Sequence, residues 1–156
     1  MVDALLDIRN LKIEATSYPP GERPRDVVLV EGVSLTLPQG RVLGLIGESG
    51  AGKSTIGLTS MAYGRGGVRI TGGEIFLKGR DILKAGVQGL RALRGREVTY
   101  VAQSAAAAFN PAKPLMEQVV ETTLWHGLMG RAEAEARAVG LFKKLGLLDP
   151  QNIGKR

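Results

Sequence analysis

The chain has 156 residues, no cysteine and a formal net charge of +6 at pH 7. This length suffices for one domain with its own core, and the 44% hydrophobic and 23% charged content is that of an ordinary globular protein. The lack of cysteine excludes disulfides and thiolate metal sites. No apolar run reaches the roughly eighteen residues of a membrane-spanning helix, and the acidic start is not a secretory signal.

The basic residues are dispersed along the sequence. One cluster comprises Arg91, Arg94 and Arg96, and another lies between residues 143 and 156. Neither cluster is interleaved with the aromatic residues that a nucleic-acid groove uses for base stacking. We therefore expect no direct binding of nucleic acid.

The first forty residues predict antiparallel strands. Residues 5–16 alternate apolar and polar side chains, which indicates a strand with one polar face. A loop rich in proline and charge follows at 18–26. Strand-like patterns resume at 27–30 and 32–37, and a turn ends them at 38–40.

A glycine-rich loop follows an apolar run at residues 41–46, which we predict to be a buried parallel strand. The loop matches the pattern G-x-x-x-x-G-K-[ST] of a phosphate-binding loop. Glycines allow successive N–H groups to point inward at a phosphate. The candidate nucleotide-binding residues are Gly47, Glu48, Ser49, Gly50, Ala51, Gly52, Lys53, Ser54 and Thr55.

Two polar side chains at the carboxyl end of this loop have distinct expected roles. The Lys53 ammonium would reach the β- and γ-phosphate oxygens, and the Ser54 hydroxyl would be a ligand of Mg²⁺. Thr55 would lie in the first turn of a helix predicted at 54–62, which Gly57 weakens. A chance glycine-rich turn is the alternative, but the order strand, loop, helix favours a nucleotide phosphate site.

Further elements are predicted downstream of the loop. Strands are expected at 73–77 and 97–102. Helical segments are expected as a turn at 90–93 and as helices at 116–126 and 131–145, the last with a clear 3.6-residue period.

Gln103 follows the predicted strand at 97–102. Ligands of open α/β sheets bind at the carboxyl ends of the strands, so the amide oxygen of Gln103 could reach Mg²⁺ or an attacking water. Taken alone, a glutamine at a strand end is more often a solvated side chain.

Together these motifs resemble ABC transporter ATPases, most closely the importer group for oligopeptides, dipeptides and nickel. The resemblance rests on residues 30–40, on the Gly-Glu-Ser form of the loop, and on Gln103 followed by Phe109-Asn110-Pro111. It implies an α/β P-loop NTPase core with an antiparallel β subdomain over residues 1–103. Residues 104–156 would begin a helical subdomain.

The resemblance implies an ATP-binding subunit that couples ATP binding and hydrolysis to uptake of a solute of peptide type. Its cofactors would be ATP and Mg²⁺. Lys53 and Gln103 would be catalytic, and Ser54 and Gln103 would contact the metal. Tyr18 is the sole candidate for the aromatic residue that stacks on adenine, with an ordinary loop tyrosine as the alternative.

The implied partners are transmembrane permease subunits, a second ATP-binding subunit in a head-to-tail dimer and, indirectly, a solute-binding protein. The implied location is peripheral, at the cytoplasmic face of a bacterial inner membrane. In this family the signature Leu-Ser-Gly-Gly-Gln, an Asp-Glu pair and a switch histidine belong beyond Arg156. Residues 1–156 alone are therefore expected to bind ATP weakly without turnover. His126 is expected to be a surface or packing residue.

Three alternatives stay open from the sequence. A small P-loop kinase would usually open with its phosphate loop, and here predicted strands precede Gly47. A non-transport ABC ATPase of DNA repair or translation is disfavoured by the importer-like spacing. A non-catalytic remnant with an exposed apolar face would be marginally stable and prone to association.

Overall fold

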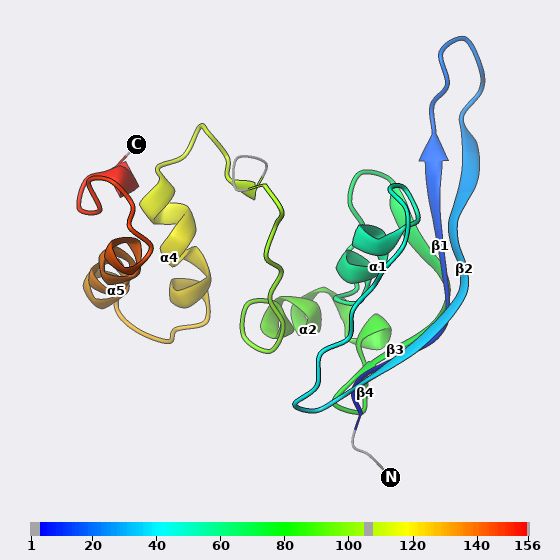
Figure 1. The fold of residues 1–156 in the computed structure, drawn as a ribbon, viewed down its shortest axis with the longest axis horizontal. Coiled ribbons are helices and arrows are strands. Elements are labelled where there is room, and N and C mark those ends of the chain that lie inside the picture. The colour runs from blue at the N-terminus through cyan, green and yellow to red at the C-terminus, as the bar shows by residue number, and fades with distance from the viewer. Residues whose placement is uncertain (1–3, 105–107, 156) are drawn as a thin grey trace. The chain divides into compact units, whose positions relative to one another are not determined.

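The computed structural model describes residues 4–104 and 108–155. The chain divides into two compact units, Met1–Arg94 and Gly95–Arg156 (Figure 1). Each unit has its own packed elements, and the phosphate-loop motif lies in the first.

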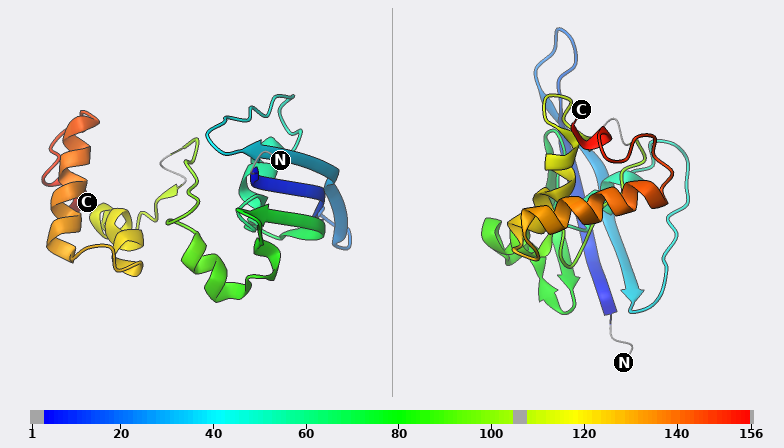
Figure 2. Two further views of the ribbon diagram at one scale, coloured as in Figure 1. Left: turned by 90° about the horizontal axis from the view of Figure 1, so that it is seen from below. Right: turned by 90° about the vertical axis from the view of Figure 1, so that its left-hand side faces the viewer.

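The first unit is built on an antiparallel sheet with strand order β2-β1-β3-β4. Its strands are β1 (Ala4–Ser17), β2 (Arg25–Pro38), β3 (Val68–Leu77) and the short β4 (Arg80–Asp81). Its helices are α1 (Lys53–Thr59) and α2 (Gly86–Leu93), with a 3-10 turn over Ile82–Lys84. The strands are seen side by side in the left view of Figure 2.

The core face of the sheet depends on a bulge in β1. Ile8, Leu11 and Ile13 are all at most 1% exposed, although strict alternation would put Ile8 and Leu11 on opposite faces. The extra residue is absorbed where Asn10 and Leu11 lie opposite Gly73 of β3, and Asn10 adopts a φ of 47°. A Cβ on Gly73 would lie 2.6 Å from the Asn10 carbonyl oxygen, so only glycine fits there.

Helix α1 lies against the core face of this sheet (Figure 1). Thr59, its last residue, is fully buried, and Met61 just beyond it is 8% exposed. At the other end, a Cβ built on Gly52 would lie 3.2 Å from Cγ2 of Val30 in β2. The start of the helix, and with it the carboxyl-terminal end of the loop, thus lies close to β2, and the far end of the helix is buried.

The second unit is helical. It consists of α4 (Leu115–Trp125), α5 (Arg131–Lys144) and a 3-10 turn at Ile153–Lys155. Helices α4 and α5 pack against each other (Figure 2). Their buried core comprises Val120, Ala134, Ala138 and Phe142.

The predicted antiparallel strands and the two late helices are confirmed, with the helices within a residue or two of the expected bounds. Two predicted strands are wrong, because residues 41–48 and 99–102 carry no regular structure. Val42 is 98% exposed and Ile46 is 99% exposed. A parallel strand needs neighbours on both edges and cover on both faces, and the described residues do not provide them for these segments.

The polar face of the sheet carries an ion-pair network across three strands. The Arg69 guanidinium of β3 lies 2.9 Å from Asp26 Oδ1 of β2 and donates to the Thr16 hydroxyl of β1 between them. The hydrogen bond from Arg69 is the main cause that lowers the pKa of Asp26, followed by the one from Thr16.

We expect this network to make stability depend on acid pH. The pKa of Asp26 is lower in the folded chain than in the unfolded chain, so its contribution is present above the ordinary aspartate pKa and is lost as pH falls through the folded value. Thermal melts of wild type and Asp26→Asn should differ at pH 7, and the difference should shrink as the pH falls below the ordinary value of 3.8. A difference that persists undiminished at pH 3 would contradict this.

We also expect the exposed segment 42–46 to drive self-association, because an uncovered apolar stretch can pair with another chain. Sedimentation should show larger species as concentration rises, and Ile46→Lys should reduce them. Leu148→Lys, at an 88% exposed leucine of the second unit, is the matched control and should change little. A monomer at every concentration would refute the expectation.

Candidate functional site

The phosphate loop takes a backbone path that needs glycine. Gly50 and Gly52 have φ of 86° and 82°, in the left-handed region that L side chains rarely adopt. Gly52 is also the residue that caps the start of α1 and contacts Val30. The conformation of two of the three glycines of the loop therefore favours glycine, and Val30 is a close neighbour of one of them, Gly52.

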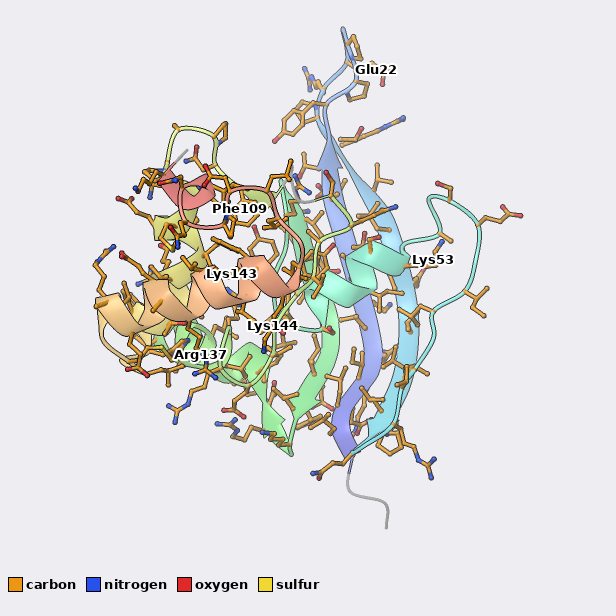
Figure 3. The ribbon with its side chains drawn as sticks, turned by 60° about the vertical axis from the view of Figure 1, so that its left-hand side comes forward. Glu22, Lys53, Phe109, Arg137, Lys143 and Lys144 are labelled. Carbon is orange, nitrogen blue, oxygen red and sulfur yellow. The ribbon has the colours of Figure 1, made fainter. Side chains whose placement is uncertain are left out.

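Lys53 folds back across the mouth of the loop. Its ammonium donates to the carbonyl oxygens of Gly47 at 2.8 Å and Glu48 at 2.6 Å. A Cβ on Gly47 would lie 3.6 Å from the Cβ of Ala51 and 4.0 Å from Cδ of Lys53, so the two ends of the loop lie close together. Figure 3 shows Lys53 between the loop and the start of α1.

The donors around the loop suit an anion. The first helical hydrogen bond runs from the Ile56 N–H to the Gly52 carbonyl at 2.8 Å, so the N–H groups of Lys53, Ser54 and Thr55 precede the helical ladder. Residues 41–51 are exposed, as is Ser54. N–H groups that precede the helical ladder and an ammonium fit phosphate, and the exposed Ser54 hydroxyl fits Mg²⁺ bound to that phosphate.

The two remaining candidate residues lie away from the loop in sequence. Gln103 is exposed and belongs to the second unit, so its approach to the loop stays a prediction. Tyr18 directly follows β1 and is 74% exposed. Its contact with adenine likewise stays a prediction.

Sequence reasoning missed Gln118, which braces the segment after Gln103. Its Oε1 accepts from the Asn110 N–H at 2.8 Å, and its Nε2 donates to the carbonyls of Asn110 and Lys113 at 2.9 Å each. The nearby Asn110-Pro111 turn signal and a glutamine in the first turn of a helix were the clues in the sequence.

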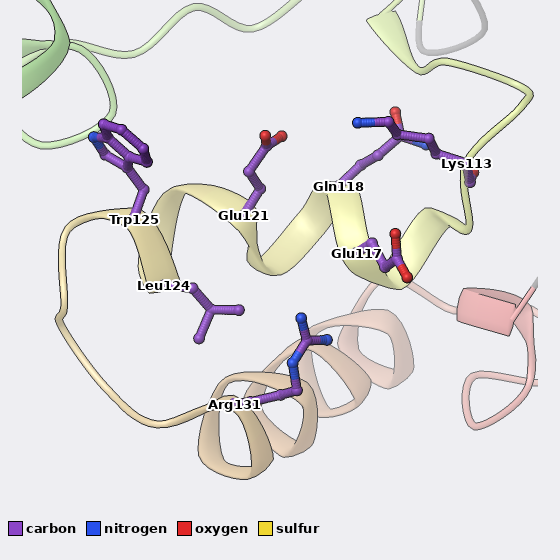
Figure 4. Close-up of a pocket in the computed structure, with 7 residues that line it drawn as sticks. All are labelled: Lys113, Glu117, Gln118, Glu121, Leu124, Trp125 and Arg131. Atoms are coloured by element: carbon purple, nitrogen blue, oxygen red, sulfur yellow. The ribbon is translucent and has the colours of Figure 1, made fainter.

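A hollow of about 370 Å³ lies on α4 in the second unit (Figure 4). It is lined by Lys113, Glu117, Gln118, Glu121, Leu124, Trp125 and Arg131. Acidic and basic side chains are mixed in it, and none of the candidate nucleotide-binding residues takes part.

Comparison with known proteins gives the family. Residues 30–155 match the family described as ABC transporter, a range that holds the phosphate loop, Gln103 and both late helices. Within the described residues, no helix is both long and apolar enough to cross a bilayer.

Similar curated proteins are ATP-binding components of transport systems. The dipeptide transport ATP-binding protein DppD of Lactococcus lactis is 29% identical over 150 residues, which cover 96% of this chain and 42% of DppD. The oligopeptide transport ATP-binding protein AppD of Bacillus subtilis is 31% identical over 155 residues, covering 99% of this chain and 46% of AppD. The glutathione import ATP-binding protein GsiA of Escherichia coli O6:H1 is 37% identical over 124 residues, which cover 80% of this chain and 19% of GsiA.

The chain thus spans less than half the length of these relatives. Within that span, the family match covers 30–155 and includes the glycine-constrained loop with its inward-folded lysine. Both the α/β P-loop fold class and the resemblance predicted from the sequence are confirmed. The chain belongs to the ABC transporter family.

Proposed function

We propose that this chain is the nucleotide-binding part of an ATP-binding subunit that drives import of a solute of peptide type. The observation that carries the proposal is the phosphate loop, whose glycine geometry and nearby lysine suit an anion. The printed names of the similar proteins support the solute class, since they describe dipeptide, oligopeptide and glutathione transport.

To bind a triphosphate, the loop residues would exchange their present hydrogen-bond partners for phosphate oxygens. Lys53 would leave the carbonyls of Gly47 and Glu48 and donate to β- and γ-phosphate oxygens instead. The N–H groups of Lys53, Ser54 and Thr55 would donate to the same phosphates. Because the ammonium already lies at the mouth of the loop, a short movement of one side chain suffices.

Magnesium and Gln103 complete the proposed chemistry. Mg²⁺, when held by the Ser54 hydroxyl and the phosphates, would neutralise charge that develops on the transferred phosphoryl group. Gln103 would orient a water through its amide oxygen, and Tyr18 would stack on the adenine. ATP hydrolysis is proposed for the whole protein.

The proposed partners follow from the family. ATP-binding subunits of ABC importers work with membrane permeases, and we propose such permease subunits as the docking partners here. A second ATP-binding subunit in a head-to-tail dimer and, indirectly, a solute-binding protein complete the assembly. The proposed location is peripheral, at the cytoplasmic face of a bacterial inner membrane.

Lys53→Ala should weaken binding of ATP by about tenfold to a hundredfold, because it removes a charged donor to the phosphates. Equilibrium dialysis with ATP and Mg²⁺ measures the affinity. Lys12→Ala is the matched control, since Lys12 lies on β1 and makes an exposed ion pair of 3.6 Å with Glu31. Equal ATP affinity in wild type and Lys53→Ala would refute the proposed site.

A further inference from the structure

The chain leaves α1 through a turn in which two carbonyl groups take no part in the helical hydrogen bonds. The N–H of Ala62 donates to the Thr59 carbonyl at 2.8 Å and that of Tyr63 to the Leu58 carbonyl at 3.3 Å, which ends the helix. Ala62 has a φ of 54°, uncommon for a residue other than glycine. The carbonyls of Met61 and Ala62 therefore lie past the last helical acceptors and need donors from elsewhere.

Arg94, just after the last residue of α2, supplies those donors. Its guanidinium donates through Nε and Nη2 to the Met61 carbonyl at 3.2 Å each, and through Nη2 to the Ala62 carbonyl at 2.7 Å. Its Cζ also lies 5.5 Å from the ring centroid of Tyr63. A planar guanidinium suits this pair of carbonyls, and its charge suits the carbonyl end of a helix.

This contact bears on the phosphate loop through α1. Helix α1 spans Lys53–Thr59, so at 1.5 Å per residue it is only about 10 Å long. Gly52 lies close to Val30 at one end of the helix, and Arg94 donates hydrogen bonds to the turn at the other end. A helix this short moves as one piece, so a shift at Met61 and Ala62 reaches Lys53.

We propose that Arg94 is a positioning residue for the phosphate loop: by binding the Met61 and Ala62 carbonyls it holds α1, and hence Lys53 and Ser54, in the orientation that phosphate binding needs. The proposal rests on the proposed function, since it assigns to Arg94 a part in the same site. Arg94 does not itself touch the phosphates.

The test compares affinities of Arg94 variants for MgATP and for inorganic tripolyphosphate by calorimetry. Arg94→Ala should weaken both ligands by about threefold to tenfold, since several charge-assisted hydrogen bonds that hold the site are lost. Arg94→Lys should recover part of the loss, and methylguanidinium added to Arg94→Ala should recover more. Arg65→Ala, which removes the same charge from the exposed turn after α1, is the matched control and should bind as wild type.

Each outcome decides the proposal. Wild-type affinity in Arg94→Ala, with binding still lost in Lys53→Ala, overturns it and leaves the proposed function intact. Weaker binding with loss of the helical circular dichroism signal, and no recovery by methylguanidinium, also overturns it, since Arg94 then only holds the fold. Should Arg94→Ala fail to fold, Arg94→Lys carries the same comparison, and affinity equal to wild type overturns the proposal. A wild-type chain that binds neither ligand defeats the proposed function itself.

Discussion

The close approach of Gly52 to Val30 is the constraint on which the candidate site depends. Gly52 has a left-handed φ of 82°, and a Cβ built on it would lie 3.2 Å from Val30 Cγ2, which is closer than ordinary van der Waals contact. Gly52 lies close to β2, and α1 starts at the next residue, Lys53. The lysine then reaches back to the carbonyls that begin the loop. Loop, helix and sheet are thus joined at one residue.

The rest of the first unit supports that junction. The bulge at Asn10, which only a glycine at position 73 accommodates, keeps the apolar residues of β1 on the face that α1 covers. Arg94 binds the far end of α1 through two carbonyls. The ion pairs of Arg69 lie on the opposite, polar face and stabilise the strands without touching the loop. Core packing and surface charge therefore act on separate faces of one sheet.

Sequence reasoning succeeded where the signal is local. The strand pattern of residues 5–16, the helix that follows the loop motif and the 3.6-residue period of α5 each lie within a short window, and the structure has these elements. It failed for residues 41–46, where an apolar run fits a buried strand but the partners must come from distant residues. The role of Arg94 was equally hidden, because it depends on a turn whose carbonyl directions follow from the unusual φ of Ala62. Whether Gln103 and Tyr18 join the site depends on contacts far apart in sequence, which no local pattern encodes.

We propose above all that the loop at residues 47–55 binds the phosphates of a nucleotide. Backbone amide NMR of the ¹⁵N-labelled chain, titrated with MgATP, tests it most directly, because each loop N–H reports on its own hydrogen bond. If the loop binds the phosphates, the largest shifts fall on residues 47–55, and AMP, which lacks the β- and γ-phosphates, produces much smaller ones. Shifts that fall instead on α4 and its hollow, or equal shifts with AMP, would contradict it.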